Sequence, residues 1–152
     1  MRFDQTRDIL QFQVAEYHRA VSRLYQVFAK QEISPRNLLM LEYLIDHELR
    51  LALAIDDFMA EAPPSALDYW FKRIEIPFPV PAAGILTDSS RTDLNQLVGT
   101  AVHYKTALIE FYDHLLQQCD AEETAKLFQA IRDQEDKGMK RFIRHAQGLE
   151  DL

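Results

Sequence analysis

Hydrophobic residues recur at spacings of three and four along most of the chain, which is the period of an α-helix. Four long segments show this period: residues 4–30, 34–61, 92–118 and a last one that begins at 120 and continues through 142. In the first segment the repeat consists of Leu10, Val14, Tyr17, Val21, Leu24 and Phe28. No segment alternates between apolar and polar residues as a half-buried strand does. The pattern therefore predicts an all-α fold.

Residues that favour helix ends agree with these boundaries. Ser34 followed by Pro35 is typical of a helix N-cap and its first helical position, and the proline pair at 63–64 ends the second helix at about residue 61. Asp120, with Glu123 three residues later, predicts a capping box at the start of the fourth helix.

The connections between the predicted helices indicate how they are arranged. Very short links join the first helix to the second and the third to the fourth, so each pair must be antiparallel. The connection over residues 62–91 holds five of the six prolines and can travel the full length of the molecule. We therefore expect one domain over residues 1–152, a ferritin-like four-helix bundle with one long crossover. An up-down-up-down bundle with a floppy loop is the alternative, which the many apolar residues of the connection disfavour.

Within this connection, residues 65–73 are predicted to form a short helix, and the proline-rich stretch after them an extended chain. Its aromatic residues are expected to pack across the outside of the bundle.

Charge and composition exclude several classes of function. The chain has 24 acidic and 17 basic residues and a net charge of -7, which disfavours binding to nucleic acid or to an anionic membrane. The sequence starts without the pattern of a secretory signal, and charge interrupts each apolar run before membrane-spanning length, so a cytoplasmic location is expected. The single cysteine, Cys119, cannot form an internal disulfide.

Several ionisable residues fall on apolar faces of the predicted helices. In the second helix Glu48 continues one hydrophobic stripe and His47 the adjoining one. His18 continues a stripe of the first helix, Lys105 one of the third, and Glu135 one of the fourth. Burial of an unpaired charge costs roughly several kcal/mol, so such groups are paired, hydrogen-bonded or bound to a metal.

Two interpretations of these residues compete, and a third leaves them scattered at the rim of the bundle. The first is a metal-free core network of His18, His47, Glu48, Lys105 and Glu135. The second is a metal site whose candidate ligands are His18, His47, Glu48, Glu110 and Glu135. Di-metal centres of ferritin-like bundles use two Glu-x-x-His pairs, but Ile45 follows Glu42 and Gly138 follows Glu135 at the histidine positions. An ammonium such as that of Lys105 also repels a divalent cation.

A separate stripe on the third helix carries two histidines and a carboxylate, which form either a ligand face or an ordinary solvated face. Its members are His103, Glu110 and His114.

Four stretches of the chain resemble an uncharacterised bacterial family of short ferritin-like, rubrerythrin-related proteins. They are RDILQFQVAEYHRAVSRLY, LLMLEYLIDHELRLALAIDDF, LDYWF and AIRDQEDKGMKR, and the resemblance covers nearly the whole chain. It implies a four-helix ferritin-like fold, with His18 and the pair His47 and Glu48 where that family tends to place polar residues. Because the full glutamate set of the rubrerythrins is missing, their peroxidase and iron-oxidase activities are not carried over.

These observations lead to two expectations of function. The first is a metal-free, cofactor-free binding or structural module that forms a homodimer and binds neither nucleic acid nor membrane; its protein or small-molecule partner is left open. The alternative is a degenerate di-metal carboxylate oxidase, peroxidase or metal-binding protein that uses iron or manganese.

Overall fold

The regular structure is helical throughout the residues that the computed structural model describes, which are 4–31, 34–82 and 93–151. The elements are α1 (Thr6–Asp8), η1 (Ile9–Val14), α2 (Ala15–Gln31), α3 (Pro35–Glu61), α4 (Pro64–Leu67), α5 (Leu94–Gln118) and α6 (Glu122–Glu150). Within these ranges the only strand-like pairing is an isolated bridge between Gln5 and Trp70. The predicted all-α fold is confirmed. Residues 32–33 and residues 83–91 of the expected crossover lie outside the described ranges.

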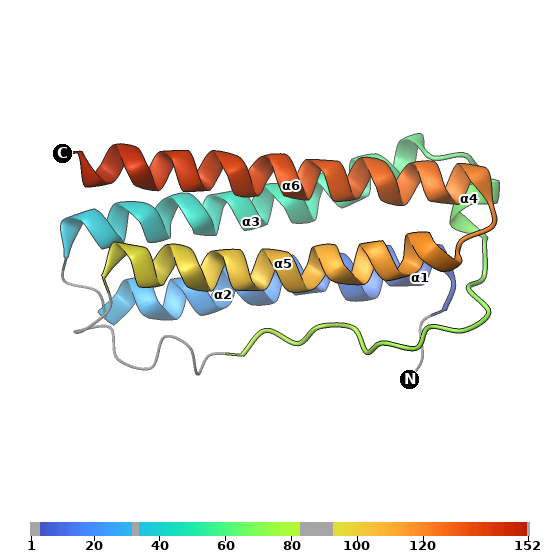
Figure 1. The fold of residues 1–152 in the computed structure, drawn as a ribbon, viewed down its shortest axis with the longest axis horizontal. Helices are drawn as coiled ribbons and strands as arrows, with labels where there is room; N and C mark the ends of the chain where they lie inside the picture. The colour runs from blue at the N-terminus through green and yellow to red at the C-terminus, as the bar shows by residue number, and fades with distance from the viewer. Residues whose placement is uncertain (1–3, 32–33, 83–92, 152) are drawn as a thin grey trace.

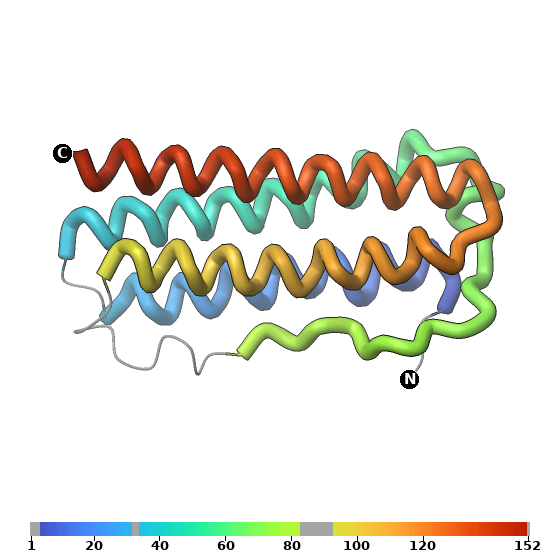
Figure 2. Tube along the Cα trace, viewed as in Figure 1, coloured from blue at the N-terminus to red at the C-terminus, as the bar shows by residue number. Residues whose placement is uncertain are grey.

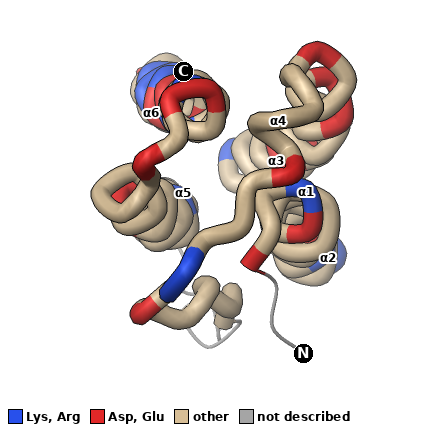
Figure 3. The backbone as a smooth tube through the Cα atoms, turned by 90° about the vertical axis from the view of Figure 1, so that its right-hand side faces the viewer, with Lys and Arg blue, Asp and Glu red and all other residues tan. Residues whose placement is uncertain are grey.

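The long helices lie side by side in a bundle (Figure 1). α1, η1 and α2 form one continuous rod, and α3 and α5 begin at the same end of the bundle, opposite the end where α6 begins. In the end view of Figure 3, α2 and α3 occupy one side and α5 and α6 the other. Residues 68–82 return along the outside of the bundle (Figure 2), in the direction of the start of α5.

The first rod contains a π-helical segment that the sequence pattern did not reveal. In η1 the backbone hydrogen bonds close over five residues instead of four, which rotates the residues on either side relative to a regular α-helix. Ile9, Leu10 and Val14 of this segment are fully buried. The segment ends three residues before Tyr17, and the side chains of Tyr17 and His18 are both buried in the core.

The predicted start and end of the second helix are confirmed, whereas the predicted capping box of the fourth is wrong. Ser34 is the N-cap of α3, and α3 ends at Glu61. The N-cap of α6 is Ala121, whose side chain makes no capping hydrogen bond. Asp120 instead accepts a hydrogen bond from the Tyr69 hydroxyl at 2.9 Å, and Glu123 accepts one from Ser65. Both carboxylates are therefore bonded to the connection between α3 and α5.

The predicted short helix ends earlier than expected, because the chain after it pairs with the N-terminal segment. α4 spans only Pro64–Leu67. Beyond it, the Tyr69 carbonyl accepts a hydrogen bond from the Thr6 amide at 2.9 Å, and the Phe71 amide donates to the Asp4 carbonyl at 2.8 Å. These bonds fix the start of the connection to the first rod.

Apolar side chains from all the long helices fill the centre of the bundle. The largest fully buried ones include Tyr25, Leu44, Phe111, Tyr112, Phe128 and Phe142. This core surrounds the buried charged residues described below.

None of the described helices is long and apolar enough to cross a membrane.

Candidate functional site

Each long helix places one buried ionisable side chain at the centre of the bundle. These residues are His18 from α2, Glu48 from α3, Lys105 from α5 and Glu135 from α6, and each is at most 3% exposed. Sequence reasoning named all of them, and the structure brings them together.

The cluster is a closed ring in which each carboxylate oxygen contacts one cationic nitrogen. His18 lies between the two glutamates, with Nδ1 2.5 Å from Glu48 Oε2 and Nε2 2.8 Å from Glu135 Oε1. Lys105 Nζ lies on the other side, 3.2 Å from Glu48 Oε1 and 2.7 Å from Glu135 Oε2. The Nε2–H of His18 is not aligned for a hydrogen bond, so its contact with Glu135 is best described as an ion pair.

The mutual contacts keep all the members of the ring charged at neutral pH. Burial alone lowers the pKa of His18, but the carboxylates of Glu135 and Glu48 outweigh it and raise this pKa to about 9. Burial alone raises the pKa of Glu135, but His18 and Lys105 lower it to about 2. In the same way Lys105 and His18 lower the pKa of Glu48, and both glutamates raise the pKa of Lys105. The ring has two positive and two negative charges and is neutral.

Buried tyrosines surround the ring, and sequence reasoning did not name them as part of the site. Tyr17 packs edge-on against His18 and donates a hydrogen bond to the Tyr104 carbonyl at 2.6 Å. The hydroxyls of Tyr25 and Tyr112 are buried without a hydrogen-bond partner in the described part of the chain. Burial and the nearby glutamates raise the pKa of both, so they stay neutral. The sequence offered one signal for these tyrosines: they lie on the same apolar stripes of the helices as the charged residues.

His47, which was expected in the same network, lies outside the ring. Adjacent residues of a helix point about 100° apart, so Glu48 and His47 face different neighbours. The His47 ring stacks toward Tyr43 and meets Phe142 edge-on, with centroid distances of 6.3 and 5.8 Å. Burial, reinforced by the charge of Lys105, lowers its pKa to about 4. His47 is therefore neutral at physiological pH.

The remaining metal-ligand candidates do not join the ring. Glu110 is exposed, as is His103 on the same stripe of α5. His114 Nε2 accepts a hydrogen bond from the Glu75 amide at 3.2 Å, against the outer connection. The ligand set proposed from the sequence is thus split between the core, the surface and a separate seam.

The donor set of the ring does not fit a divalent metal ion. Every carboxylate oxygen of Glu48 and Glu135 already contacts a cation, and a metal at the same place would meet the ammonium of Lys105. No group of three or more His, Cys, Asp or Glu side chains is arranged to hold a metal within residues 4–31, 34–82 and 93–151. The arrangement can hold charge and couple the four helices, but it offers no open coordination position.

Comparison with protein-family models, with curated proteins and with solved structures gives no match to this chain.

Proposed function

We propose that the chain is a ferritin-like four-helix bundle in which an ion-pair ring takes the place of a di-metal centre, and that it acts as a metal-free binding or structural module. The ferritin-like assignment is supported by the common end at which α3 and α5 begin and by the outer course of the chain between them (Figure 1). The four groups of the ring come from four helices at the centre of the bundle. Di-metal sites of ferritin-like proteins are built from the same kind of inward-facing positions.

The observation that carries the proposal is the complete use of the glutamate oxygens by His18 and Lys105. Removal of one partner from a buried ion pair costs about 3–5 kcal/mol, because it leaves a charge without compensation. A metal ion would have to displace the Lys105 ammonium from two carboxylates at 2.7 and 3.2 Å. The ring is therefore a stable alternative to metal binding and supports a non-enzymatic role.

Metal analysis of protein purified without chelators tests this proposal. We expect far less than one equivalent of iron or manganese per chain, before and after incubation with either metal and removal of the excess. About two equivalents per chain, the content of a di-metal bundle, would contradict the proposal and favour the oxidase or peroxidase alternative.

We also infer that the module forms a homodimer through α3. Leu49 and Leu53, four residues apart on one face of this helix, are 41% and 64% exposed, and Leu39, closer to the start of the same helix, is 47% exposed. Exposed leucines grouped on one helix are typical of a contact surface, and a two-fold dimer buries the same patch on both copies.

A further inference from the structure

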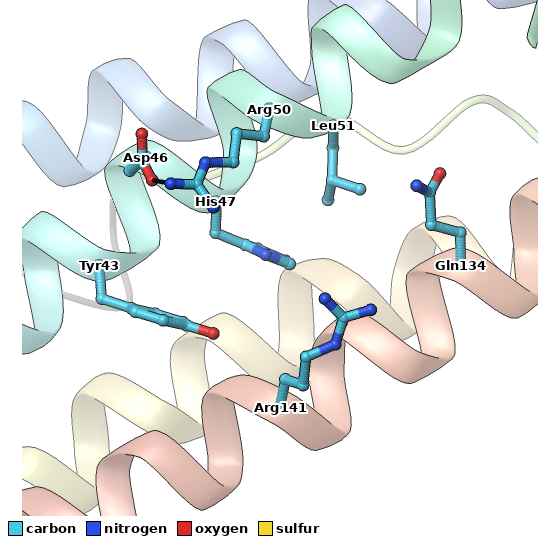
Figure 4. A pocket seen from close by; sticks show the side chains of 8 residues that line it. Tyr43, Asp46, His47, Arg50, Leu51, Gln134 and Arg141 are labelled. Atoms are coloured by element: carbon cyan, nitrogen blue, oxygen red, sulfur yellow. Dashed lines mark ion pairs between the residues drawn. The ribbon is translucent and has the colours of Figure 1, made fainter. Parts of the chain in front are cut away.

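A pocket lies between α3 and α6. It has a volume of about 200 Å³ and is lined by residues of both helices, among them Tyr43, Asp46, His47, Arg50, Gln134 and Arg141. Figure 4 shows the guanidinium of Arg141 turned from α6 toward the His47 ring, with the Tyr43 hydroxyl beside it. None of these residues belongs to the ion-pair ring.

The pocket carries a surplus of positive charge. Arg50 is paired with Asp46 at 2.8 Å, so these two side chains neutralise each other. Arg141 makes no ion pair or hydrogen bond with any residue in the described part of the chain. The whole protein has a net charge of -7, so this pocket is a locally positive site in an acidic protein.

Neutral polar groups also line the pocket. His47 Nε2 is buried and has no hydrogen-bond partner among the described residues. A buried polar atom without a partner carries a desolvation cost, so a ligand that bonds to it recovers part of that cost. Tyr43 is held in place by stacking on His145, with ring centroids 4.1 Å apart. Gln134 of α6 also lines the pocket, farther along from the Arg141 guanidinium (Figure 4).

We propose that this pocket binds a small oxyanion, the carboxylate or phosphate group of a small molecule, with Arg141 as its charge partner. A guanidinium bonds to two oxygens of such a group at once. The His47 Nε2–H tautomer, the Tyr43 hydroxyl and the Gln134 amide supply further donors. The volume is below the ~300–1,000 Å³ of drug-sized ligand sites, so the ligand is small. This inference rests on the proposed function and names the ligand class of the binding module.

Anion binding at this pocket should depend on pH. The titratable and charged groups near His47 come from both helices of the pocket. Tyr43, Asp46 and Arg50 lie on its own helix, and Arg141 lies on α6, where His145 stacks on Tyr43. The charged groups of the ion-pair ring also act on His47. Without a ligand, burial and Lys105 hold the His47 pKa at about 4. A bound anion stabilises the protonated imidazole and raises this pKa. For an anion that keeps its charge over this range, binding is then coupled to proton uptake and becomes tighter as the pH falls from neutral toward 4.

The test is calorimetric titration of the full chain with inorganic phosphate and, separately, with succinate. We expect saturable binding of at least one probe, with the imidazole NMR signals of His47 shifting along the titration. Arg141→Gln should weaken binding about tenfold or more, since a charge-assisted hydrogen bond contributes about 1.5–3 kcal/mol. Arg144→Gln is the matched control: Arg144 is exposed on the same helix but does not line the pocket, and its loss should leave the affinity unchanged.

A steric variant provides an independent arm. A Cβ at position 138 would lie 2.7 Å from His47 Cε1, so Gly138→Ala forces the ring to move and should also abolish binding. No saturable binding of either probe, or an equal loss in Arg141→Gln and Arg144→Gln, would overturn the inference. Metal analysis of the same preparations keeps the outcomes separate, because a metal-loaded core contradicts the proposed function whatever the titration shows.

Discussion

Lys105 is the residue on which the balance of the core depends. Of the two cations of the ring, it is the one that keeps its charge to the higher pH, because both glutamates raise a pKa that is already far above neutral. Its ammonium touches both carboxylates, whereas His18 can lose its proton when the pH rises above its pKa of about 9. A glutamate at this position would have added a third carboxylate of the kind that binds metal ions. The lysine instead forms ion pairs with the two glutamates that are present.

Lys105→Met should therefore destabilise the protein strongly. The variant keeps the volume of the side chain but leaves two buried carboxylates with one imidazolium, so we expect a loss of about 3–5 kcal/mol in the free energy of unfolding. Urea unfolding at neutral pH measures it. Lys140→Met is the control, since Lys140 pairs with Asp136 at the surface and such pairs contribute about 0–1 kcal/mol. Equal effects of the two substitutions would show that the ring does not stabilise the core.

Because His18 is charged in the folded protein, the free energy of unfolding should depend on pH in the alkaline range. Its pKa is raised from 6.5 to about 9 in the folded protein, so folding favours the protonated form. The resulting stabilisation is complete below pH 6.5 and is lost as the pH rises through 9, by at most on the order of 3 kcal/mol. Urea unfolding between these limits should show this decline in the wild type and a smaller one in His18→Gln. His103→Gln, at an exposed histidine, should keep the decline; a wild-type profile that is flat across this range would contradict the charge assignment.

At the scale of elements, the sequence predicted helices better than their local details. Ser34, Pro35 and the prolines at 63–64 act through the backbone of their own segment, so the limits of α3 could be read directly. The π segment could not, because Ile9 to Val14 is apolar enough to suit either helix type and packing decides between them. The Asp120 prediction failed for a related reason: Tyr69, distant in sequence, bonds to the carboxylate.

The contact between α3 and α6 predicts different outcomes for two glycines of the same helix. An alanine at position 138 meets the His47 ring at 2.7 Å, whereas one at position 148 has nothing within 4 Å. Gly148→Ala should stabilise the protein by up to ~1 kcal/mol through helix propensity. Gly138→Ala should be less stable than Gly148→Ala by about 1–3 kcal/mol, since overpacking is added. Thermal unfolding compares the two, and equal stabilities would mean that the His47 ring is free to move away.

At the scale of the whole molecule, the candidate site was predictable in its members but not in its limits. The stripe positions of His18, Glu48, Lys105 and Glu135 follow from helical periodicity, which indicates that each faces the core. Which core side chains meet depends on the rotation and offset of four helices, and a sequence pattern does not contain these quantities. For this reason His47 was grouped with Glu48, and the pocket at Arg141 was not foreseen.

The assembly state is the last property that the surface of the bundle predicts. Leu53, the most exposed leucine of α3 at 64%, lies at the centre of the proposed dimer contact, with Leu49 one turn before it. In a two-fold dimer Leu53→Glu places two carboxylates in a desolvated contact, where like charges repel strongly. We expect sedimentation velocity to show a dimer for the wild type and a monomer for this variant. Val27→Glu is the matched control, because Val27 is 52% exposed on a different helix, α2, and should leave the dimer intact. A monomeric wild type at every concentration tested would contradict the dimer, and the α3 leucines would then face solvent.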